Sequence, residues 1–75
     1  MLFEKTETVR ITVTGMRCAH CKAAVETALK AVRGVRKAIA DPQGGFAEIT
    51  YVPAKTSPEE LAEAIRGAGF EADLT

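Results

Sequence analysis

Alternation of apolar and polar residues predicts four strands along the chain. Successive side chains of a strand point to opposite faces, so a period of two marks a strand that buries one face. The alternation is strict over residues 8–14 and returns over residues 47–51 and 70–74. Residues 35–40 form a less regular strand, because apolar residues occur at both parities. The predicted inward positions of the three regular strands are Val9, Ile11, Val13, Ala47, Ile49, Tyr51, Phe70, Ala72 and Leu74.

Two segments with a different period predict helices between these strands. Their apolar residues recur at i, i+3, i+4 and i+7, which places them on one stripe of a helix. The first helix is expected over residues 21–32, after a loop over residues 15–20, with Glu26 and Lys30 on its solvent side. The two apolar stripes consist of Val25, Ala28, Leu29 and Val32, and of Leu61, Ala64, Ile65 and Ala68.

Turn and capping residues indicate where these elements begin and end. Gly34 is expected to end the first helix, because glycine accepts the backbone conformation that closes a helix. Ser57 opens the second helix, and Glu60 completes a Ser-x-x-Glu capping box with it. Residues 41–45 contain a proline and two glycines, which predicts a turn joining the second and third strands as a hairpin.

The resulting order, strand-helix-strand-strand-helix-strand, indicates an α+β protein with a ferredoxin-like fold. Two strand-helix-strand halves of nearly equal length suit a βαββαβ sandwich, in which a four-stranded antiparallel sheet carries both helices on one face. A length of 75 residues allows one domain with a small core. We expect that domain over residues 8–75, with residues 1–7 as an N-terminal extension.

Composition and charge exclude several classes of protein. Ten Lys and Arg balance ten Asp and Glu, so the formal net charge is zero and gives no case for nucleic-acid binding. The sequence lacks the long apolar run of a membrane span and the shorter one of a signal peptide. We therefore expect no membrane insertion and a cytoplasmic location. No catalytic constellation is visible, which indicates a protein that is not an enzyme.

The candidate chemistry lies in the loop after the first strand and in the first turn of the helix. Cys18 and Cys21 form a Cys-x-x-Cys pair, which in a reducing compartment indicates a metal site or redox chemistry. The N-terminus of a helix favours an anion such as a thiolate. Because a thiolate serves both a soft metal and disulfide exchange, the spacing alone leaves both functions open.

The surroundings of the pair favour a soft metal ion with few ligands. A loop can place two sulfurs on opposite sides of one Cu(I) ion. No Asp or Glu flanks the loop, so hard cations such as Ca²⁺ and Mg²⁺ are poorly served. Zn(II) would require four ligands, whereas two Cys and one His are present. Cu(I) is therefore expected first, with Zn(II) a weaker alternative.

The stretch Gly15-Met16-Arg17-Cys18-Ala19-His20-Cys21 resembles the Gly-Met-x-Cys-x-x-Cys motif of heavy-metal-associated domains. The resemblance extends to Gly34-Val35, to Ser57-Pro58-Glu59-Glu60-Leu61 and to Ala68-Gly69-Phe70. This family includes cytosolic copper chaperones, modules of copper-transporting P-type ATPases and mercury-binding proteins. The resemblance implies the βαββαβ fold, two-coordinate Cu(I) on Cys18 and Cys21, and ligand-exchange transfer to a P-type ATPase or another metal-binding domain. It adds Hg(II) as an alternative ion, and allows a monomer or a metal-bridged dimer.

Two positions depart from the motifs of this family. Arg17 stands where its members usually carry a small hydroxyl residue, which bears on partner docking or metal preference. Phe70 stands where bacterial chaperones often have Tyr and eukaryotic ones Lys, and it resembles the ATPase-attached modules more closely. A free chaperone and a module of a larger protein therefore both remain open.

Residues around the cysteines have more than one interpretation. Met16 is expected to fill the core and anchor the loop rather than bind metal. Three roles are open for His20: it binds the metal directly, it influences the thiolates from outside the coordination shell, or it lies in solvent. Phe70 is a core residue or an apolar shield beside the metal. Three residues form either a basic patch that docks an acidic partner or an ordinary solvated surface: Arg17, Lys22 and Lys30.

The main rival function is that of a thiol-disulfide oxidoreductase of glutaredoxin type. Such an enzyme also places Cys-x-x-Cys between a strand and a helix, and Tyr51-Val52-Pro53 superficially resembles its cis-proline segment. The Ala-His pair between the cysteines is unlike the residues common in those enzymes, and a connection with a capping box follows Pro53 instead of a core strand. A plain interaction domain is a further alternative.

Overall fold

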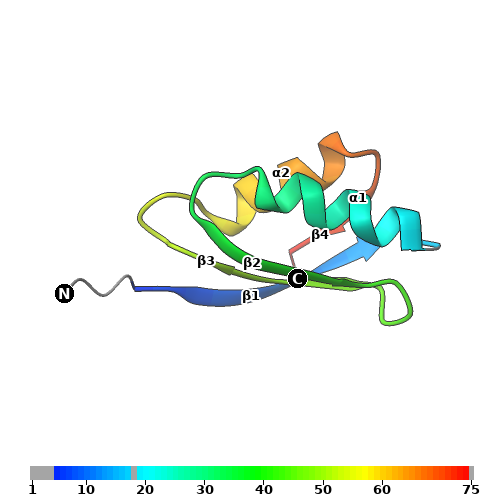
Figure 1. Ribbon diagram of the computed structural model, residues 1–75, viewed down its shortest axis with the longest axis horizontal. Coiled ribbons are helices and arrows are strands. Elements are labelled where there is room, and N and C mark those ends of the chain that lie inside the picture. Colours follow the sequence, from blue (N-terminus) through cyan, green and yellow to red (C-terminus); the bar gives the residue numbers. More distant parts are fainter. Residues whose placement is uncertain (1–4, 18, 75) are drawn as a thin grey trace.

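The computed structural model describes residues 5–17 and 19–74 and has the predicted βαββαβ order (Figure 1). The four strands form one antiparallel sheet in the order β2-β3-β1-β4, and both helices cover one of its faces. The ferredoxin-like sandwich expected from the sequence is confirmed. The elements are β1 (Glu7–Thr14), α1 (Ala19–Lys30), β2 (Val35–Asp41), β3 (Phe46–Tyr51), α2 (Pro58–Gly67) and β4 (Glu71–Asp73).

The strand register brings the end of β1 next to the start of β4. β1 pairs with β3 along most of its length, from Glu7 opposite Tyr51 to Thr12 opposite Phe46. Only its last residues pair with the short β4, and Thr14 lies opposite Glu71. The chain therefore leaves the sheet beside β4 just before it enters α1, and this is where the two cysteines occur in the sequence.

The core lies between the sheet and the two helices and consists mainly of aliphatic side chains. The largest fully buried residues come from both layers, so strands and helices bury their apolar faces against each other. Their burial follows the predicted alternation in β1 and β3 and the predicted stripes of the helices. The core cluster consists of Ile11, Val13, Met16, Val25, Leu29, Ala38, Ala40, Ala47, Ile49, Tyr51, Leu61 and Ile65.

A bulge explains why β2 has no clear alternation in the sequence. The β2–β3 ladder shifts register between Val35 and Lys37, which changes the parity of the strand partway along it. After the shift Ala38 and Ala40 are buried, while Ile39 points to the other face and is 41% exposed. The apolar residues at both parities are thus accommodated by one irregular strand.

Several predicted boundaries were wrong by about two residues. α1 begins at Ala19 and ends at Lys30, so His20 is helical rather than part of the loop. β4 ends at Asp73, and Leu74, which was expected to face the core, is 39% exposed. Ala68 is also exposed, because the chain has left α2 at that point. In its place the helix buries Ala62, which the predicted stripe omitted.

The start of α2 follows the capping signal in the sequence. Ser57 has extended backbone angles, and its Oγ accepts the amide N–H of Glu60 at 3.4 Å. Pro58 takes the first helical position, where its missing N–H costs no intrahelical bond. The predicted N-terminus of this helix is confirmed.

Candidate metal site

The segment between β1 and α1 begins with a glycine that turns the chain away from the sheet. Gly15 has a φ of +108°, a backbone conformation that other residues adopt only under strain. Arg17 follows two residues later and is exposed, and α1 begins at Ala19. Cys18, the first predicted ligand, lies outside the described residues. The glycine thus sets the direction in which the chain approaches the helix.

Met16 anchors this segment in the core. Its side chain is 8% exposed and belongs to the core cluster together with residues of β1 and α1. A methionine buried in this way contributes dispersion contacts and fills irregular space. The burial agrees with the core position expected from the sequence.

Cys21 lies in the first turn of α1. It is half-buried, and it packs against the core cluster from the helical side. The first turn of α1 contains no acidic residue, and the backbone amides there give that end of the helix a partial positive charge. The position therefore suits a thiolate ligand that is fixed to a rigid element.

Phe70 lies on the β4 side of the same segment. It is partly buried, packs against the core cluster, and comes directly before β4. A Cβ atom built on Gly15 would stand 3.5 Å from Phe70 Cδ1, which is ordinary van der Waals contact. The structure thus places this ring beside the loop that leads to Cys18.

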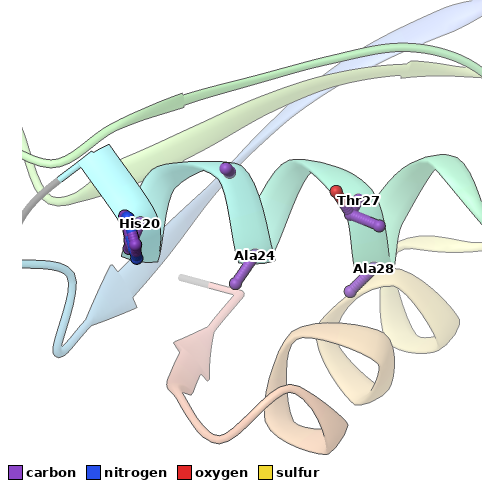
Figure 2. A pocket seen from close by; sticks show the side chains of 5 residues that line it. His20, Ala24, Thr27 and Ala28 are labelled. Carbon is purple, nitrogen blue, oxygen red and sulfur yellow. The ribbon is translucent and has the colours of Figure 1, made fainter.

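His20 is exposed, and it borders a shallow groove along α1. Figure 2 shows His20, Ala24 and Ala28 on the same side of the helix. The groove has a volume of about 550 Å³ and is also lined by Ala23 and Thr27. Among the described residues, no group of three or more His, Cys, Asp and Glu side chains is arranged to hold a metal ion.

Lys22, the residue after Cys21, forms an ion pair with Glu26 one turn further along α1. Lys22 Nζ lies 3.3 Å from Glu26 Oε2, and the same oxygen accepts the backbone N–H of Ala40 at 2.9 Å. The Ala40 amide and the nearby Lys22 lower the pKa of Glu26 from 4.5, although burial works against them. The expectation that Glu26 lies on the solvent side was wrong, because its carboxylate reaches across to β2.

The expected basic patch is therefore partly balanced by a carboxylate. Arg17 and Lys30 are exposed, whereas the charge of Lys22 is matched by Glu26. The spacing of Lys22 and Glu26, at i and i+4, could have predicted their pairing. The bond to Ala40 joins residues far apart in sequence and left no local signal.

The sequence comparisons decide the family. The model of the heavy-metal-associated domain matches residues 10–71, a range that includes both cysteines and all but the ends of the fold. The chain belongs to the heavy-metal-associated domain family. The motif from Gly15 to Cys21 and the βαββαβ order are therefore features of one known kind of metal-binding module.

Similar proteins include both copper and mercury proteins. A copper-transporting ATPase of Oryza sativa subsp. japonica is 44% identical over 62 residues, which cover 83% of this chain and 6% of that protein. A periplasmic mercuric transport protein component of Acinetobacter calcoaceticus is 37% identical over 73 residues, covering 97% of this chain and 80% of that protein. The solved CopZ metallochaperone superposes with a TM-score of 0.86 at 32% identity, over 88% of this chain and 98% of its own.

These matches differ in how much of each relative they cover. The heavy-metal-associated domain described here spans about 6% of the length of the rice ATPase, so it corresponds to one small part of that protein.

Within residues 5–17 and 19–74, neither helix has the length and apolar character that crossing a bilayer requires.

Proposed function

We propose that this domain binds one Cu(I) ion between the thiolates of Cys18 and Cys21 and transfers it by ligand exchange to another protein. The observation that carries the proposal is the family match across residues 10–71, together with the position of Cys21 in the first turn of α1. Two thiolates suit a soft ion that accepts few ligands. The copper-transporting ATPase and the metallochaperone among its relatives support copper as the cargo.

The low coordination number explains how tight binding and fast transfer can coexist. Two sulfurs leave the ion open to attack by a cysteine of the acceptor, and a three-sulfur intermediate then passes the ion across. Cys21 is anchored in α1, whereas Cys18 precedes the helix in sequence, so we expect Cys18 to exchange first. Differences in affinity between donor and acceptor set the direction.

The proposed partner is a metal-transporting P-type ATPase or another metal-binding domain in the cytoplasm. The domain acts as a free chaperone or as a module of such a transporter. Arg17 and Lys22 are candidates for docking an acidic surface, although Glu26 already matches the charge of Lys22. His20 is exposed and stays a candidate for an outer-shell role or a ligand. Phe70, beside Gly15, is a candidate apolar shield for the ion.

Mercury binding is the second candidate, and one observation favours it. The mercuric transport component matches 97% of this chain and 80% of its own length, a more complete match than that of the ATPase. Two thiolates bind Hg(II) by the same chemistry. Competition between Cu(I) and Hg(II) for the reduced domain distinguishes the two cargoes.

Transfer by ligand exchange can be tested with the domain as its own acceptor. Cu(I)-loaded unlabelled protein is mixed without oxygen with metal-free ¹⁵N-labelled protein, and the appearance of the loaded form is followed by NMR. We expect exchange much faster than spontaneous Cu(I) release into a chelator, and its loss in a Cys18→Ser acceptor. Exchange no faster than release would contradict the mechanism.

A redox function makes a different prediction. A thiol-disulfide oxidoreductase would turn over glutathione mixed disulfides rapidly and retain no Cu(I). We expect slow turnover in this assay and tight Cu(I) retention by the same sample. Fast turnover without Cu(I) retention would favour the oxidoreductase instead.

A further inference from the structure

β2 is an edge strand, and one of its outward amides is bonded to a side chain. Among residues 5–17 and 19–74, the sheet order β2-β3-β1-β4 leaves one side of β2 without a strand. The N–H of Ala40 points to that side, where Glu26 Oε2 accepts it at 2.9 Å. Backbone hydrogen bonds between neighbouring strands have about this N···O length. A carbonyl oxygen of an added strand would therefore occupy the position of Glu26 Oε2. Glu26 thus stands where another strand would bind.

The direction of the Ala40 amide determines how an added strand could pair. Backbone groups of alternate residues in a strand point to the same side, so Ala38 shares the outward direction of Ala40. The ladder between β2 and β3 is regular from Lys37 to Asp41. This stretch therefore offers a short, regular edge with its outward donors and acceptors at Ala38 and Ala40.

The side chains of this edge are complementary to a second copy of the same edge. Ala38 and Ala40 are buried under the helices, so Lys37, Ile39 and Asp41 lie on the open face of the sheet. Ile39 is one of two large hydrophobic residues that are exposed in the described part of the chain. If two copies met antiparallel with Ile39 opposite Ile39, each Lys37 would face Asp41 of the other copy. Asp41 Oδ1 accepts the amides of Gln43 and Gly44 in its own turn, so Lys37 would meet the carboxylate at Oδ2.

The same register also satisfies the backbone. With Ile39 on the two-fold axis, Ala38 of one copy lies opposite Ala40 of the other, and the two residues exchange hydrogen bonds. The Ile39 pair is then a non-hydrogen-bonded pair, in which opposed side chains come closest. One register therefore satisfies the backbone hydrogen bonds, the Ile39 contact and the Lys37–Asp41 pairs together. Because this contact has two-fold symmetry, it closes into a dimer.

We infer that the edge of β2 is a docking surface for a second copy of this chain and that Glu26 keeps this edge closed. The carboxylate satisfies the Ala40 amide, is held by Lys22 at 3.3 Å, and must leave before another strand can add. Side chains that cover an edge are a known protection against strand addition. The inference is independent of the proposed metal transfer, because it uses none of the proposed ligands.

Removal of the carboxylate tests this inference on the reduced protein in the presence of a metal chelator. We expect E26A to pass from monomer to dimer as its concentration rises in analytical ultracentrifugation, while the wild type stays monomeric. E26Q is the matched control, because its amide oxygen still accepts the Ala40 N–H, and it should stay monomeric. Adding Ile39→Lys to E26A should restore the monomer, since two cations would meet on the two-fold axis.

Two results would overturn the inference. One is a folded E26A protein, checked by circular dichroism, that remains monomeric at every concentration. The other is an E26A dimer that persists with Ile39→Lys, because its interface would then lie elsewhere. Glu26→Ser, whose side chain is too short to reach Ala40, gives the same test if the alanine variant does not fold. The chelator removes a metal-bridged dimer from the experiment, and Cu(I) affinity is measured separately.

Discussion

The ring of Phe70 lies against Gly15, with Cδ1 3.5 Å from the point where a Cβ atom of residue 15 would stand. Gly15 follows β1, and Phe70 precedes β4, so the contact joins the two chain segments beside the entrance to α1. Met16 fixes the same loop from the core side. The segment that follows β1 is therefore positioned by a glycine conformation, a buried methionine and an aromatic ring.

Replacing Gly15 by Ala should destabilise the domain through the backbone rather than by a clash. A φ of +108° is strained for any residue with a Cβ, and the expected loss is about 1–3 kcal/mol of unfolding free energy. Gly67→Ala is the matched control, because Gly67 lies in α2 with open space around it, and it should gain about 0.5–1 kcal/mol. Urea unfolding of both variants measures the two changes in unfolding free energy. Equal changes in the two variants would contradict the prediction.

Met16 should matter for stability and not for metal affinity. Met16→Ala should cost about 2–4 kcal/mol because it leaves a cavity in the core, whereas Met16→Leu should cost less than about 1.5 kcal/mol. The Cu(I) affinity of folded Met16→Leu should equal that of the wild type. If this variant lost Cu(I) as completely as the cysteine variants, Met16 would be a ligand and its assignment to the core alone would be wrong.

The regular elements were predictable because local patterns encode them. The alternation of Val9, Ile11 and Val13 and the Ser57 cap each act within a few residues, and the structure contains both features. The start of α1 was missed because its first turn has no acidic residue to mark it. The parity of β2 was unclear because a bulge changes it within the strand.

The family was predictable from the motif, whereas the contacts around Cys21 were not. The Cys-x-x-Cys spacing and the flanking Gly15 and Met16 identified the family that the comparisons show. The hydrogen bond from Ala40 to Glu26 joins the edge of the sheet to a helix residue 14 positions earlier in the sequence. No local sequence pattern predicts such a bond. Long-range polar contacts of this kind depend on the assembled fold.

Replacing Thr56 by valine should stabilise the folded protein. Its Oγ1 is buried and has no hydrogen-bond partner among the described residues. An isosteric Thr56→Val change removes this unsatisfied hydroxyl, and we expect the unfolding free energy to rise by about 1 kcal/mol. Thr50→Val is the control, because Thr50 Oγ1 is exposed and lies 3.1 Å from Thr8 Oγ1, and it should bring no gain. A loss of stability in Thr56→Val would contradict the prediction.

Glu26 should make the stability of the domain depend on pH in the acid range. Its pKa in the folded protein is lowered from 4.5, mainly by the bond from the Ala40 amide, so folding favours the ionised form. The resulting stabilisation is fully present above pH 4.5 and is lost as the pH falls through the lowered pKa. E26Q should therefore be less stable than the wild type by about 1–2 kcal/mol at neutral pH.

The same comparison at low pH checks the sign of this effect. The difference between wild type and E26Q, measured by urea unfolding at a series of pH values, should shrink as the pH falls below 4.5. A difference that stayed constant down to strong acid would show that ionisation of Glu26 is not its cause.

The central claim is that Cys18 and Cys21 together hold one soft metal ion. The most direct measurement is an anaerobic Cu(I) titration of the reduced protein against a competing chromophoric chelator, with Zn(II) and Hg(II) measured in parallel. We predict tight binding of one Cu(I) per chain or per dimer, with retention lost in both Cys18→Ser and Cys21→Ser. Weak Cu(I) binding, or tight binding that survives either substitution, would contradict the claim. If Cu(I) binding is weak and Hg(II) binding is tight, mercury is favoured as the cargo.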